Sequence, residues 1–155
     1  MPNRRCPTSP FRPAGRYDDA VARAYRVIEW TAQWILKTRA GLDTADLPAD
    51  KASGLVQPSR DGKYQAGLFA AWQLVQTHTG GAGARFFADH GSGLLSQLLK
   101  RNQSILAHGF RPVSQEDWGA MCTWLEAHFV PTLRDEMNAA GQKQVFPQLP
   151  SVYLW

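Results

Sequence analysis

Apolar residues recur every three to four positions along most of this chain, and this helical periodicity most constrains its fold. The clearest apolar face lies in residues 17–37 and consists of Val21, Ala24, Ile28, Thr31 and Ile35. Such spacing places side chains on one side of an α-helix. The alternating pattern typical of a strand does not recur, and no internal repeat is visible. The sequence therefore predicts an all-α fold.

The periodicity predicts a bundle of four or five helices. The expected helical segments are residues 17–37, 61–77, 85–89 and 94–108, and a long one from Ser114. In the first helix, Trp30 and Trp34 form a second apolar stripe, which predicts burial around much of its circumference. In the helix over 94–108, the residues expected to face inward are Leu95, Leu98, Leu99, Ile105 and Leu106.

Glycine, proline and a capping pattern mark the expected helix ends. Breaks between helices are expected at Gly80, Gly81, Gly83, Gly91 and Gly93. Ser114 followed by Asp117 resembles a capping box that opens the last long helix. Pro131 lies inside that helix and is expected to kink or interrupt it.

Length and charge favour one folded domain preceded by an arm. The 155 residues suggest a single domain over 17–155, and the arginine-rich and proline-rich residues 1–16 suggest a linker or disordered arm. The formal net charge is +4, but four arginines precede Tyr17, and the remainder has 13 basic and 13 acidic residues. Any RNA contact by the folded part must therefore come from local arrangement. The apolar, proline-rich residues 145–155 are expected to dock on the bundle as an extended segment.

Other residue patterns exclude several classes of protein. No apolar run approaches the ~18 residues of a membrane span, so no membrane partner is expected. The two cysteines, Cys6 and Cys122, predict a cytoplasmic protein with no disulfide framework. The remaining histidines, His78, His90 and His128, are scattered without metal-ligand spacing, which predicts no metal site and no cofactor.

The segment RNQSILAHGF, residues 101–110, holds the candidate catalytic residues. Arg101 and His108 are seven positions apart, which places both on one face of a helix with Ser104 between them. RNA can be cut without a metal when its 2′-hydroxyl attacks the adjacent phosphorus. Histidine suits the proton transfers because its usual pKa of ~6.5 lies near neutral pH. Arginine suits the phosphate because its planar fork stays protonated.

The proposed roles have structural alternatives. Asn102 and Ser104 can hold the imidazole or a phosphate oxygen by hydrogen bonds, whereas Arg101 can equally be a solvated helix residue. His108 can equally be a cation at a helix C-terminus, where it interacts with the dipole. Because helical rise separates Arg101 and His108 by roughly 10 Å, a two-fold dimer that joins two such pairs would complete the site.

Three carboxylates in the first helix are further candidates. Asp18 and Asp19 favour the N-terminus of the helix, and capping or solvation explains them before catalysis does. Glu29 sits among apolar neighbours and is expected to pair with an arginine.

RNQSILAHGF resembles the motif of HEPN ribonuclease domains, in which an arginine is followed four to six residues later by a histidine. GRYDDAVARAYRVIEW and FPQLP resemble the opening helix and the end of the HEPN domain in CRISPR-associated CARF–HEPN proteins of type III systems. This resemblance covers about residues 15–150. It implies a HEPN-type bundle with Arg101, Asn102 and His108 as active-site positions.

The resemblance also implies partners and a reaction. It suggests a homodimer with a composite cleft, single-stranded RNA as substrate, a role in antiviral defence, and a CARF sensor domain in the full-length protein. No CARF-like segment precedes the helices, so the chain is either an excised effector domain or a stand-alone one. A non-catalytic helical dimerisation or RNA-binding module is the alternative to a metal-independent endoribonuclease.

Overall fold

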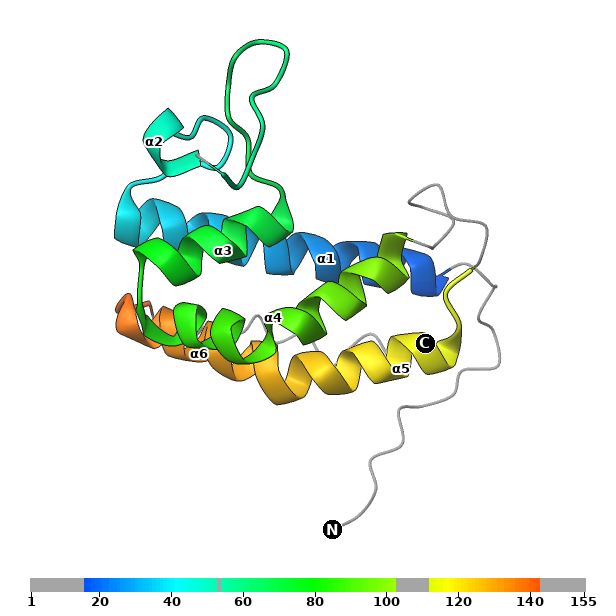
Figure 1. Cartoon of the computed structure of the whole chain (residues 1–155). Helices are drawn as coiled ribbons and strands as arrows, with labels where there is room; N and C mark the ends of the chain where they lie inside the picture. Colours follow the sequence, from blue (N-terminus) through cyan, green and yellow to red (C-terminus); the bar gives the residue numbers. More distant parts are fainter. Residues whose placement is uncertain (1–15, 53, 103–111, 143–155) are drawn as a thin grey trace, which may run out of the picture.

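The computed structural model describes residues 16–52, 54–102 and 112–142, and these residues form a helical bundle (Figure 1). The elements are α1 (Arg16–Ile35), η1 (Leu36–Ala40), α2 (Ala49–Ala52), α3 (Leu68–His78), α4 (Gly81–Asn102), α5 (Gln115–Trp124), η3 (Leu125–Phe129) and α6 (Val130–Ala139). η1 and η3 are single π-helical turns that continue α1 and α5. Within the described ranges, β-pairing is limited to isolated bridges at Tyr64, to Leu47 and to Pro58. The predicted all-α fold is confirmed.

The helices enclose one apolar core. α3 packs on α1 and α4, α4 also packs on α6, and α5, η3 and α6 follow one another along the opposite side (Figure 1). Trp72 of α3 is fully buried, as are Ile28 and Ile35 of α1 and Leu94 of α4. The inward face predicted for the first helix is therefore confirmed at these positions, and burial of its apolar side chains supplies the main driving force for folding.

Two predictions at the start of α5 and α6 are confirmed. The hydroxyl of Ser114 accepts a hydrogen bond from the backbone N–H of Asp117 at 3.0 Å, and the Asp117 carboxylate accepts from the Ser114 N–H. Pro131 stands in the first turn of α6, directly after the π-helical turn η3. Proline is tolerated in a first turn, where its missing N–H removes no helical hydrogen bond.

The predicted break within 81–93 is wrong, because α4 runs unbroken from Gly81 to Asn102. Its glycines allow close packing. A Cβ on Gly83 would lie 2.9 Å from Cδ1 of Ile35, and one on Gly93 would lie 2.9 Å from Nε1 of Trp124. A sequence pattern cannot distinguish such glycines from helix breakers, because their neighbours come from other helices.

The second helix begins at Leu68 and not at Asp61 as predicted. The residues before it pair with the loop that follows η1: the N–H of Leu47 donates to the carbonyl of Tyr64, and the N–H of Ala66 donates to the carbonyl of Thr44, both at 2.9 Å. Backbone groups used in this long-range pairing are not available for a helical turn.

Three apolar residues expected to face inward lie on the surface. Trp30 is 56% exposed, Leu95 is 42% exposed and Leu99 is 52% exposed. The continuous helix α4 instead buries a face made of Gly83, Phe86, Phe87, Gly91 and Leu94. Spacings of three and four residues along that face leave positions 95 and 99 pointing outward.

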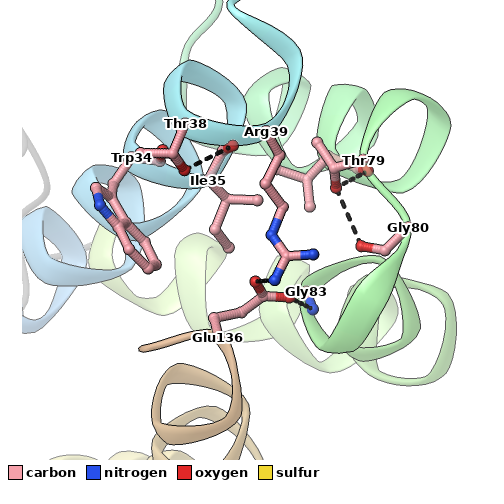
Figure 2. Close-up of polar contacts among 9 residues, drawn as sticks. Trp34, Ile35, Thr38, Arg39, Thr79, Gly80, Gly83 and Glu136 are labelled. Carbon is pink, nitrogen blue, oxygen red and sulfur yellow. Dashed lines mark hydrogen bonds and ion pairs between the residues drawn. The ribbon is translucent and has the colours of Figure 1, made fainter. Parts of the chain in front are cut away.

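A buried charge cluster joins η1, α4 and α6 (Figure 2). Glu136 is fully buried, and its carboxylate lies 2.7 Å from Nη2 of Arg39, whose side chain is 30% exposed. Its other oxygen accepts a hydrogen bond from the N–H of Gly83 at 2.7 Å. Gly83 stands in the first turn of α4, where backbone N–H groups have no partner in the helix and favour an anion.

This asymmetric burial predicts unequal effects from removing each charge. Arg39→Met leaves a fully buried carboxylate without its cation, and we expect a loss of about 3–5 kcal/mol in the free energy of unfolding. Glu136→Gln leaves a guanidinium that can reach water, and we expect a loss of about 1–3 kcal/mol. Urea denaturation followed by far-UV circular dichroism measures both. Asp135→Asn on the same helix is the control, expected within about 0.5 kcal/mol of wild type. Equal losses at Arg39 and Glu136 would contradict this account.

The close approach at Gly93 predicts that replacing this glycine by alanine destabilises the protein, whereas the same replacement at Gly119, also in a helix, stabilises it. Gly119→Ala adds a Cβ that meets nothing within 4 Å, and we expect about 0.5–1 kcal/mol of stabilisation from reduced backbone entropy. Gly93→Ala drives a Cβ into the Trp124 ring, and we expect a net loss of about 1–3 kcal/mol from overpacking. Thermal denaturation of both variants checks the sign. Stabilisation by Gly93→Ala would show that the packing of α4 against Trp124 does not require glycine at position 93.

Candidate active site

Two of the predicted active-site residues stand at the C-terminal end of α4. Arg101 and Asn102 are the last two residues of that helix. Their side chains, together with Ser104 and His108, lie outside the described part of the structure. The arrangement of the Arg101 and His108 side chains therefore stays a prediction, and the described residues define what surrounds them.

Three helix ends meet around this position. In Figure 1 the last turn of α4, the first turn of α1 and the first turn of α5 lie at the same end of the bundle. α1 packs against both α4 and α5. The chain leaves this end at Asn102 and re-enters the described structure at Pro112. The described residues on both sides of the segment that contains His108 therefore lie at this end of the bundle.

Asp18 anchors the point where the chain re-enters. It lies in the first turn of α1 and is 5% exposed. Both of its carboxylate oxygens lie 3.3 Å from the backbone N–H of Val113, which donates to them. Val113 immediately precedes Ser114, the residue that caps α5. Asp18 therefore fixes α5 and the end of the preceding segment against α1, a role beyond the capping or solvation expected from the sequence.

The other two carboxylates of α1 are explained by local ion pairs. Asp19 lies 2.9 Å from Nε of Arg23, and both side chains are exposed. Glu29 pairs with Arg26, as predicted. These contacts are three or four residues apart on one helix, which is the spacing that sequence reasoning detects. The Asp18–Val113 contact spans 95 residues and has no such signal.

Basic residues occupy helix ends at this same end of the bundle. Arg16 begins α1, and Lys100 and Arg101 stand in the last turn of α4. The start of α1 and the last turn of α4 lie at the same end of the bundle (Figure 1), so two helices contribute basic residues to this end. Clustered basic residues are what binding of an RNA backbone requires.

Two histidines pack together elsewhere in the bundle. The rings of His90 in α4 and His128 in η3 have centroids 4.1 Å apart, flanked by Phe86 and Trp124. The sequence predicts that His78, His90 and His128 are scattered, whereas the structure brings two of them together. In the described residues, no group of three or more His, Cys, Asp or Glu side chains could hold a metal ion. The histidine pair is part of the aromatic packing between α4 and η3.

None of the helices in the described ranges combines the length and the apolar character that crossing a bilayer requires.

Comparison of the sequence with known protein families identifies a match. Residues 12–128 match the family model described as the Csm6 HEPN domain, and the match includes α1, α4 and the whole segment RNQSILAHGF. No curated protein and no solved structure matches the chain significantly. HEPN domains are generally ribonucleases, which suggests a nuclease role in CRISPR-associated defence for the chain. Because the matched residues cover most of its length, the chain belongs to the CRISPR-associated Csm6 HEPN domain family.

Proposed function

We propose that this chain is a metal-independent endoribonuclease that cuts single-stranded RNA at an active site completed by a second copy of the chain. The observation that carries the proposal is the position of Arg101 and Asn102 at the end of α4, inside the family match. The basic residues at this end supply attraction for the RNA backbone. The family resemblance further implies a CARF sensor domain in the full-length protein and a cytoplasmic role in antiviral defence.

The proposed reaction uses the RNA's own 2′-hydroxyl as nucleophile. The oxygen attacks the adjacent phosphorus while one imidazole takes its proton, and the leaving 5′-oxygen receives a proton as its bond to phosphorus breaks. Arg101 stabilises the negative charge that develops on the phosphoryl oxygens. Asn102 and Ser104 orient the imidazole or the phosphate. The products are a 2′,3′-cyclic phosphate and a free 5′-hydroxyl.

A dimer suits both the chemistry and the described surface. One histidine cannot readily act on both sides of the same phosphate, so a two-fold axis that brings in a second His108 supplies the missing group. Leu95 and Leu99 form an exposed apolar stripe on α4, four residues apart and close to Arg101 in sequence. Exposed apolar stripes of this kind favour burial against a partner.

His108→Ala tests the proposed catalysis. We expect wild-type protein to cut single-stranded RNA in EDTA and to leave 2′,3′-cyclic phosphate ends. The variant should lose about 100-fold or more in rate, because general acid–base catalysis contributes that much. Gel analysis of end-labelled RNA measures the rate, and treatment with a phosphatase that opens cyclic phosphates identifies the product ends.

His78→Ala is the matched control, since His78 ends α3 at the opposite end of the bundle (Figure 1). Its rate should equal that of wild type. On dilution, specific activity should fall as the dimer dissociates. RNA binding or self-association without turnover would contradict the enzyme and favour a dimerisation or RNA-binding module.

Asp18→Ala tests whether the anchor positions the active site. The substitution leaves the Val113 N–H without its acceptor, and we expect about 1–2 kcal/mol of destabilisation. We also expect kcat to fall about ten-fold with little change in KM, because misplacing a catalytic group slows the reaction much more than it weakens RNA binding. Rates are measured at a temperature where circular dichroism shows every variant fully folded.

Two variants control this experiment. Asp19→Ala removes the exposed neighbour and should leave kcat unchanged. Asp18→Asn keeps one acceptor oxygen for Val113 and should recover part of the lost rate. A folded Asp18→Ala variant with wild-type kcat would rule out a positioning role.

A further inference from the structure

An apolar groove lies between α1 and α6, at the opposite end of the bundle from the end of α4. It has a volume of about 390 Å³ and is lined by Val27, Trp30, Thr31, Trp34, Leu133, Met137 and Gln142. Trp30 has the highest exposed fraction among the large apolar residues of the described ranges, and Val27 is 45% exposed. Large apolar side chains that stay exposed around one groove mark a candidate docking surface.

The groove offers little for a polar ligand to bind. The hydroxyl of Thr31 already donates to the carbonyl of Val27 at 2.8 Å within α1. One face of the Trp30 ring lies near the guanidinium of Arg26, 5.4 Å from its centroid, and Arg26 also pairs with Glu29. Apart from Gln142 at its edge, the remaining lining is indole, aliphatic and thioether surface, which suits an apolar peptide segment.

The end of α6 directs the chain to this groove. Gly141 has a φ of +67°, and its N–H donates to the carbonyl of Asn138 while the Gln142 N–H donates to the carbonyl of Met137. These two bonds form a Schellman motif, which reverses the chain and brings the residue after the glycine against the last helical turn. Both Met137 and Gln142 line the groove, so the chain leaves the described structure at the groove's edge.

We propose that residues 143–155 of this same chain occupy the groove as an extended segment. Seven of these 13 residues are apolar or aromatic: Val145, Phe146, Leu149, Val152, Tyr153, Leu154 and Trp155. Pro147 and Pro150 oppose a helix and favour an extended backbone. Lys143 is the single charged side chain in the segment.

The length of the segment fits the groove. The part of α1 that lines it, from Val27 to Trp34, is about 10 Å long at the helical rise of 1.5 Å per residue. An extended chain covers ~3.3 Å per residue, so three or four residues after Gln142 reach along it. Val145 and Phe146 are therefore the first apolar side chains that can meet Trp30. This proposal is independent of the RNA-cleaving activity, since the groove's lining comes from the second half of α1 and from α6, at the end of the bundle opposite the last turn of α4 (Figure 1).

Site-specific photo-cross-linking in the full chain tests the proposal. Phe146→p-benzoylphenylalanine places a photoreactive group in the segment, and mass spectrometry of proteolysed protein locates its adducts. We expect adducts on the peptides that contain Val27, Trp30, Trp34 or Met137. Mixing isotope-labelled and unlabelled chains separates adducts within one chain from adducts between two copies.

Two matched variants make the test specific. Trp30→Glu places a charge in the groove and should lower the adduct yield at least five-fold. Leu95→Glu changes a similarly exposed apolar residue on α4, outside the groove, and should leave the yield unchanged. Circular dichroism confirms that both variants fold.

Three results would overturn the proposal. Adducts that form only between labelled and unlabelled chains would show that a second copy fills the groove. Adducts on other surfaces, or none in folded protein, would show that the segment does not occupy it.

Discussion

The position of α4 depends on the buried contact between Arg39, Glu136 and Gly83. A carboxylate removed from water needs compensation, and here it receives a cation from η1 and a backbone N–H from the first turn of α4. The contact therefore joins three segments that are distant along the chain. A Cβ on Gly81 would lie 3.0 Å from both Arg39 and Glu136, and Gly81 has a φ of +77°, so glycine suits this position at the start of α4. Charge and close packing together hold that end of the helix.

The consequences of this contact extend along α4. Once its start is held between Ile35 and Glu136, the helix runs unbroken past Trp124, and its last turn reaches the end of the bundle where α1 and α5 begin (Figure 1). Arg101 and Asn102 are thereby carried to the end at which Arg16 also stands. Asp18 holds the returning chain there through Val113. The buried ion pair at one end and the proposed active site at the other are thus linked by one continuous helix.

The apolar residues left on the surface have a common physical origin. A helix in a small bundle packs against neighbours on one side, so a second apolar stripe stays exposed unless another chain segment or molecule covers it. Trp30 lines the groove at whose edge Gln142 ends the described chain, whereas Leu95 and Leu99 lie on α4. Leu95 and Leu99 do not line the groove, which is consistent with the proposal that the chain covers one surface and a second copy covers the other.

Local patterns in the sequence were enough to predict the helical class, the inward face of α1, the capping box at Ser114, the interruption at Pro131 and the motif at Arg101. Each of these rests on contacts within about one or two turns, where residue type and spacing carry the information. Packing between distant segments determined that Gly83 and Gly93 lie within one helix, that Leu94 and not Leu95 faces inward, and that Asp18 holds Val113. Those outcomes depend on atoms from segments 31 to 95 residues away, whose approach no local pattern encodes.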